Sequence, residues 1–145
     1  MTKEKKSRAA FEQELQRKYL QLQLYRHQLN ALTEEKNNLD ARSAELRVTI
    51  AAIEEFEKIE KGDEIWSSLG SNAFVMSDIK DTKNVLVSIG AGVVIKSTKE
   101  HSLEILQSRL NELDEIRRAM EAEILKYSEE VSKLEPEVQR LAQEL

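Results

Sequence analysis

The sequence contains no cysteine, and this absence removes several kinds of chemistry together. Disulfide bonds, zinc sites built from thiolates and a thiol nucleophile are all excluded. Proline occurs once, glycine four times, and aromatic residues make up only 5% of the 145 residues. Because large apolar side chains are so few, we expect burial along a thin seam, with help from other chains, rather than in a thick core.

Long apolar runs and an excess of positive charge are also missing. The longest apolar stretch lies near residues 85–95 and is too short to span a bilayer. The charged start of the sequence does not resemble a signal peptide. The net charge of −5 disfavours nucleic acid as the main partner, because binding phosphate requires a positive field. We therefore expect a soluble, cytoplasmic protein with no membrane or nucleic-acid partner.

Charged residues are abundant, at 34%, and together with Leu and Ala they are typical of long helices. Residues 8–61 contain neither Gly nor Pro. Within them, positions separated alternately by three and four residues form a heptad seam in which eight of ten residues are apolar: Leu22, Tyr25, Leu29, Leu32, Lys36, Leu39, Ser43, Leu46, Ile50 and Ile53. This pattern predicts a coiled-coil helix over residues 8–61.

A second heptad seam occupies residues 99–145. Twelve of its thirteen positions are apolar: Leu103, Leu106, Leu110, Leu113, Arg117, Met120, Ile124, Tyr127, Val131, Leu134, Val138, Leu141 and Leu145. Ser97 followed by Glu100 resembles a capping box and Thr98 is a rival N-cap, so this helix should begin near Lys99. Neither helix would be stable alone, and we expect the two to pair in an antiparallel coiled coil.

The segment between the arms, residues 62–98, has a different composition. It contains β-branched residues and short turn signals, which predict strands over Glu64–Leu69, Ala73–Lys80, Asn84–Ile89 and Val93–Thr98. Four such strands with free edges would make a poor isolated sheet, so the segment should pair with other subunits. The apolar residues expected to serve oligomerisation are Phe74, Met76, Val85, Val87, Ile89, Val93 and Ile95.

The middle segment resembles the double-hairpin region of prefoldin α subunits. The resemblance is carried by residues 69–75 (Leu-Gly-Ser-Asn-Ala-Phe-Val) and by residues 81–95, which contain the run Val-Leu-Val-Ser-Ile-Gly-Ala-Gly-Val. It implies one domain over residues 1–145, with hairpins that assemble into an intersubunit β barrel. It also implies a hexamer of two α and four β subunits, with no cofactor, that captures unfolded proteins without ATP and delivers them to a group II chaperonin.

On that analogy the two ends of the chain form the working tip. Apolar residues remote from the hairpins would lose their seam partners there and contact a client: Phe11, Leu15, Tyr19, Val138, Leu141 and Leu145. The alternative function is a coiled-coil scaffold, or a filament-forming prefoldin relative, whose tips bind no client. A membrane or nucleic-acid tether is a third class, disfavoured by the charge and by the absence of an anchor.

Other residues give no sign of catalysis or of a metal or cofactor site. His27 and His101 have no third ligand nearby in sequence, and Asp78 and Asp81 fall at a strand end or turn, where aspartate is common. We therefore expect no enzymatic activity. Pro136 predicts either a kink without a role or a splay that exposes Val138 and Leu141. Lys3, Lys5, Lys6 and Arg8 suggest a disordered, solvated tail, or else a contact with an acidic chaperonin surface.

Overall fold

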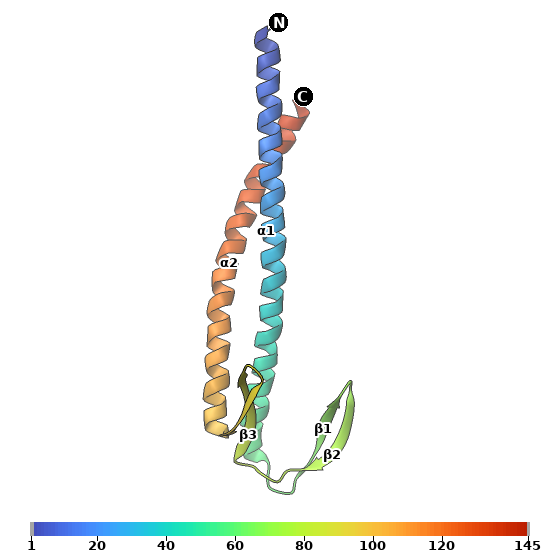
Figure 1. The fold of residues 1–145 in the computed structure, drawn as a ribbon, viewed down its shortest axis with the longest axis vertical. Helices are drawn as coiled ribbons and strands as arrows, with labels where there is room; N and C mark the ends of the chain where they lie inside the picture. The colour runs from blue at the N-terminus through green and yellow to red at the C-terminus, as the bar shows by residue number, and fades with distance from the viewer. Residues whose placement is uncertain (1, 145) are drawn as a thin grey trace. The chain divides into compact units, whose positions relative to one another are not determined.

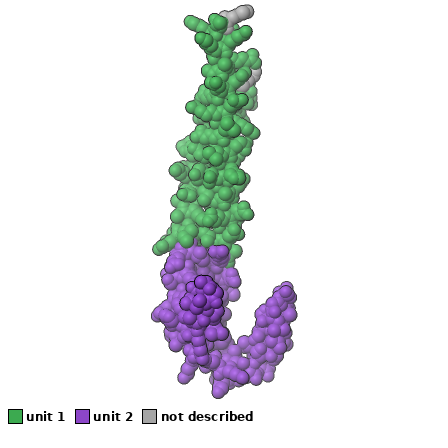
Figure 2. All heavy atoms as spheres, viewed as in Figure 1, with its two compact units in different colours: residues 1–41, 115–145 green, residues 42–114 purple. Residues whose placement is uncertain are grey.

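The chain consists of a long helix, two β hairpins and a second long helix, in the order that the sequence predicts (Figure 1). The computed structural model describes residues 2–144. Its elements are α1 (Thr2–Glu55), a short 3-10 helix (Phe56–Lys58), β1 (Glu64–Gly70), β2 (Ala73–Asp78), β3 (Asn84–Gly90), β4 (Val93–Thr98) and α2 (Lys99–Gln143). These residues form two compact units, one of residues up to 41 and from 115 onward, the other of residues 42–114 (Figure 2).

In the first unit, segments of α1 and α2 lie side by side and run in opposite directions (Figure 1). Lys36 Nζ lies 3.8 Å from Glu121 Oε1, whereas Asp40, farther along α1, contacts Arg117, which comes earlier in α2, at 3.3 Å. The seam buries Leu22, Leu134 and Leu141. The heptad spacing explains this arrangement, because it keeps one apolar face of each helix toward the other.

In the second unit, the β3–β4 hairpin packs against the helices. Val87 of β3 forms a buried cluster with Ile53 of α1 and Leu106 of α2. The guanidinium of Arg109 in α2 donates a hydrogen bond to the Ser88 carbonyl of the same hairpin. The β3–β4 hairpin therefore covers one side of this helix pair. The sequence had predicted that Val87 contacts other subunits, whereas it is buried within its own chain.

The two hairpins have the same pattern of strand pairing, and equivalent residues lie twenty positions apart in the sequence. Glu64 pairs with Asp78 in β1–β2, and Asn84 pairs with Thr98 in β3–β4. In each hairpin the first strand carries one extra residue before the turn, at Leu69 and at Ile89. Ser71-Asn72 and Ala91-Gly92 then turn the chain with positive φ at both residues, the geometry that matches the twist of the flanking strands.

Several boundaries differ from those predicted. The helix α1 begins at Thr2, so the lysines at its start are exposed on a helix rather than in a disordered tail, and it ends at Glu55, before residue 61. The strand β2 ends at Asp78, not Lys80; just beyond it, the Ile79 amide still donates to the carbonyl of Asp63, the residue before β1, at 2.9 Å.

The start of α2 at Lys99 agrees with the prediction, and the structure decides between the two candidate caps. The Thr98 hydroxyl accepts a hydrogen bond from the His101 amide at 3.2 Å, which satisfies a donor at the start of the helix. Ser97 is buried instead. Within residues 2–144, no helix is long and apolar enough to cross a bilayer.

Candidate functional site

The N-terminal part of α1 and the C-terminal part of α2 lie at the same end of the first unit, where α1 extends beyond α2 (Figure 1). Three residues of α1 reach this tip on successive turns: Phe11 and Leu15 are half-buried, and Tyr19 is 49% exposed. From α2, Val138 is half-buried, whereas Leu141 is only 4% exposed and belongs to the seam. Leu145 lies outside the described residues. The structure thus brings four of the predicted tip residues to a partly open surface and buries one.

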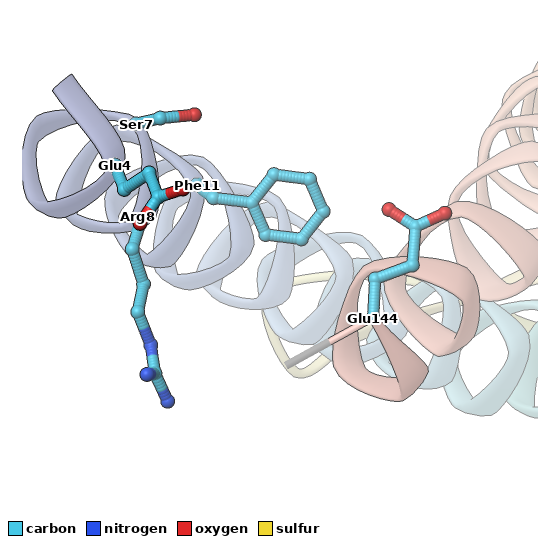
Figure 3. Close-up of a pocket in the computed structure, with 5 residues that line it drawn as sticks. All are labelled: Glu4, Ser7, Arg8, Phe11 and Glu144. Carbon is cyan, nitrogen blue, oxygen red and sulfur yellow. The ribbon is translucent and has the colours of Figure 1, made fainter. Parts of the chain in front are cut away.

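A shallow hollow of about 410 Å³ lies between the ends of the two helices. It is lined by Glu4, Ser7, Arg8 and Phe11 of α1 and by Glu144 near the end of α2. Figure 3 shows the Phe11 ring directed toward the part of the chain that carries Glu144. The hollow therefore combines one aromatic surface with charges of both signs.

Two ion pairs join the helices just behind the tip. Lys18 Nζ donates to Glu137 Oε2 at 2.7 Å, and Arg26 donates to Glu135 Oε1 at 2.5 Å. The hydrogen bond from Lys18 holds the pKa of Glu137 below its usual value, and the same contact raises the pKa of Lys18. Glu135 and Glu137 directly precede and follow Pro136, so each neighbour of the proline forms an ion pair with α1.

The helix α2 continues through Pro136 to Gln143. Leu134 and Leu141, on either side of the proline, are both buried. In this structure Pro136 therefore does not splay the helices so as to expose Leu141. Both leucines pack into the seam, and the two ion pairs also join α2 to α1 on either side of Pro136, which cannot donate a backbone hydrogen bond.

Sequence reasoning missed a second apolar surface near the tip. Leu20 and Leu24 of α1 are 67% and 57% exposed, although neither belongs to the heptad seam. A signal was present in the sequence, because Arg26 is the only Lys, Arg, Asp or Glu among residues 19–33. At the chain's overall charged content of 34%, about five would be expected in a window of that length.

The hairpins carry a separate apolar surface. Trp66, Phe74 and Met76 are exposed on β1–β2, and a hollow of about 520 Å³ is lined by Trp66 and Phe74. Of the residues predicted for oligomerisation, Ile89 and Val93 are also exposed, Val85 and Ile95 are half-buried, and Val87 is buried against the helices. No residue of β1 or β2 is fully buried, which leaves both faces of that hairpin accessible.

Asp81, one of the two aspartates considered for catalysis, has a structural role. Asp81 caps the turn between the hairpins, since its carboxylate accepts bonds from the Lys83 amide at 2.9 Å and from the Asn84 amide at 3.0 Å. These bonds, with one from the Asn84 side chain, lower the pKa of Asp81 to about 2. Within residues 2–144, no three His, Cys, Asp or Glu side chains are grouped so that they could hold a metal ion.

Paired helical arms, a partly apolar tip and two hairpins with free strand edges define a coiled-coil subunit whose surfaces suit contacts with other chains. Comparison with known proteins identifies it further. The Prefoldin subunit family profile matches residues 25–144. The chain belongs to the prefoldin family of chaperone subunits.

Similar proteins agree with the family and with its α class. Prefoldin subunit alpha of Methanococcus vannielii is 30% identical over 130 residues, which cover 90% of this chain and 87% of that protein. Prefoldin subunit alpha of Archaeoglobus fulgidus is 28% identical over 127 residues, covering 88% and 93%. The predicted family is therefore confirmed.

Solved structures support the fold. Filamentous prefoldin from Methanocaldococcus jannaschii has a TM-score of 0.70 at 24% identity, over 80% of this chain and 96% of that one. The prefoldin beta subunit of Thermococcus strain KS-1 has a TM-score of 0.57 at 18% identity, over 88% and 90%. The predicted arrangement of two long helices with β hairpins between them is confirmed.

Proposed function

We propose that this chain, assembled with prefoldin β subunits as two α with four β, captures unfolded proteins at the tips of its helical arms and passes them to a group II chaperonin. The observation that supports capture is the incomplete burial of Phe11, Leu15, Tyr19 and Val138 at the end of the arm remote from the hairpins. Weak apolar contacts on several arms would add through multivalency. No nucleotide, cofactor or catalytic step is required, and the complex would act in the cytoplasm.

The hairpins would form the platform of the assembly. Each hairpin is a two-stranded sheet with unpaired edges, and β1–β2 exposes Trp66, Phe74 and Met76. Isolated two-stranded sheets are marginally stable, and free edges readily pair with other strands. Pairing with the hairpins of β subunits into an intersubunit β barrel would satisfy both the backbone groups and the exposed apolar side chains.

The experiment is suppression of aggregation of a chemically denatured protein by the complex assembled with its β partner, without ATP. A variant with Phe11→Gln and Tyr19→Gln should need about threefold more complex for the same suppression, because apolar contacts at the tip are lost. The control is Val48→Gln with Leu125→Gln, which also removes two exposed apolar side chains but outside the tip. Native mass measurement before the assay verifies that each variant still assembles.

A second candidate function is a filament-forming scaffold. One observation favours it, namely the likeness of this fold to a filamentous prefoldin. Electron microscopy of the chain alone separates the two proposals: filaments together with no suppression of aggregation would support the scaffold, whereas a defined complex with β subunits that suppresses aggregation would support the chaperone.

A further inference from the structure

The outward face of α1, opposite the seam, has an unusual surface near the tip. Steps of three and four residues along the helix place six exposed residues on this face, which we term the outer stripe: Gln13, Gln16, Leu20, Leu24, His27 and Ala31. The seam residues Leu15, Leu22 and Leu29 occupy the other side of the same turns and are buried or half-buried.

The outer stripe carries no carboxylate, lysine or arginine, and Arg17 lies beside it. Glu34 follows Ala31 at the next step, so the stripe ends where charged residues return. Outward faces of helices in water are normally covered by charged side chains. A stripe of uncharged residues with two exposed leucines, between Gln13 and Ala31 of α1, therefore departs from that pattern and needs an explanation.

We propose that the outer stripe is a second contact for the unfolded client, on the flank of the arm and separate from the tip hollow. The inference rests on the proposed function and extends it. The stripe is continuous with the tip along α1, because Gln13 and Gln16 occupy the same turns as Phe11 and Leu15. A client segment held at the tip would be able to continue along the arm.

The composition and size of the stripe favour this occupant over others. A stable protein interface buries about 800 Å² on each partner, drawn from about 20–30 residues, whereas the stripe has six residues. The six stripe residues are without a carboxylate, lysine or arginine, so apart from Arg17 beside them they offer little charge complementarity to a folded, charged partner such as a chaperonin. The same neutrality tolerates unfolded segments of either net charge, and glutamine side chains offer donors and acceptors to an extended backbone.

The test uses the complex assembled with β subunits and a denatured client. Leu20→Gln with Leu24→Gln removes the apolar groups without adding charge, at little cost in helix propensity. The matched control is Val48→Gln with Leu125→Gln, at positions that are 71% and 61% exposed and lie outside the stripe. We expect the stripe variant to need about threefold more complex for equal suppression, with the control unchanged. Equal loss in both variants would overturn the inference.

A second readout does not depend on aggregation. The photocrosslinking residue benzoylphenylalanine at position 20 should attach to the client, and at position 48 it should not. Crosslinks at position 20 only to another subunit or to chaperonin would overturn the inference, as would equal client crosslinking at both positions. If the native complex fails to suppress aggregation but position 20 still crosslinks to client, the proposed function fails and the stripe contact remains.

Discussion

Lys18 of α1 and Glu137 of α2 form a hydrogen-bonded ion pair at 2.7 Å, although 119 positions separate them in the sequence. Glu137 directly follows Pro136, and Glu135 directly precedes it and bonds to Arg26. The turn of α2 that contains Pro136 is therefore joined to α1 on both sides by ion pairs, beside the buried Leu134 and Leu141 of the seam. The first of these ion pairs leads to a first prediction.

The contribution of the Lys18–Glu137 pair should depend on pH. The pKa of Glu137 is lowered from 4.5, so its stabilising effect is present above pH 4.5 and is lost as the pH falls through the lowered value. The pKa of Lys18 is raised from 10.5, so its effect is present below pH 10.5 and is lost above the raised value. The difference in Tm between the native protein and Glu137→Gln should be constant from about pH 5 to 10 and shrink outside that window. A difference that does not shrink as the pH is lowered progressively below 4.5 would contradict this assignment.

Leu106→Ala should destabilise the second unit. Its side chain is buried with Ile53 and Val87, and truncation leaves a cavity that costs about 2–5 kcal/mol. Urea unfolding followed by circular dichroism measures the change. The control is Leu125→Ala, which removes the same atoms from an exposed position on the same helix and should cost less than about 1 kcal/mol. Similar losses in both variants would argue against the cluster.

Ser43→Ala should stabilise the protein. Ser43 is a seam residue that is 1% exposed, and its hydroxyl has no hydrogen-bond partner among residues 2–144. Removing a buried hydroxyl without a partner, and placing a better helix former there, should raise the free energy of unfolding by about 1 kcal/mol. The urea midpoint should increase at unchanged slope. A lower midpoint would indicate that the hydroxyl has a bonding role.

Gly90→Ala should weaken the β3–β4 hairpin by backbone strain alone. Gly90 has a φ of +104°, which alanine rarely adopts, while a Cβ built there would meet nothing within 4 Å. The expected cost is about 1–2 kcal/mol, visible as faster amide hydrogen exchange in β3 and β4. Ala91→Gly is the opposite change, since Ala91 already has a φ of +51°, and it should slow exchange in the same strands.

The helices and strands were predictable because their signals are local and repeated. The seam leucines mark one helix face over many turns, and Leu22, Leu106 and Leu134 are buried as that pattern requires. The strand positions followed from turn residues at short intervals, such as Gly70-Ser71-Asn72. The bulges at Leu69 and Ile89 were not predicted, because they depend on how the backbone twists into a turn rather than on residue type.

The tip was only partly predictable. Phe11 and Leu15 were found because they continue the seam, but the seam pattern does not show how far each arm reaches past the other. That length decides which residues lose their partners, so Leu141 was expected at the surface and is buried. Leu20 and Leu24 were missed because the heptad pattern identifies only seam positions. The feature that could have revealed them is the small number of charged residues around them in the sequence.

Because Ser7 and Glu144 line one hollow, they are natural positions for a pair of fluorescent labels. Energy transfer between them would begin high and fall whenever the helix ends separate, so the pair would follow opening of the arm in real time. A bulky group attached at either of these two positions would fill the same hollow. Labels and tags on this chain should therefore be chosen with that shared location in view.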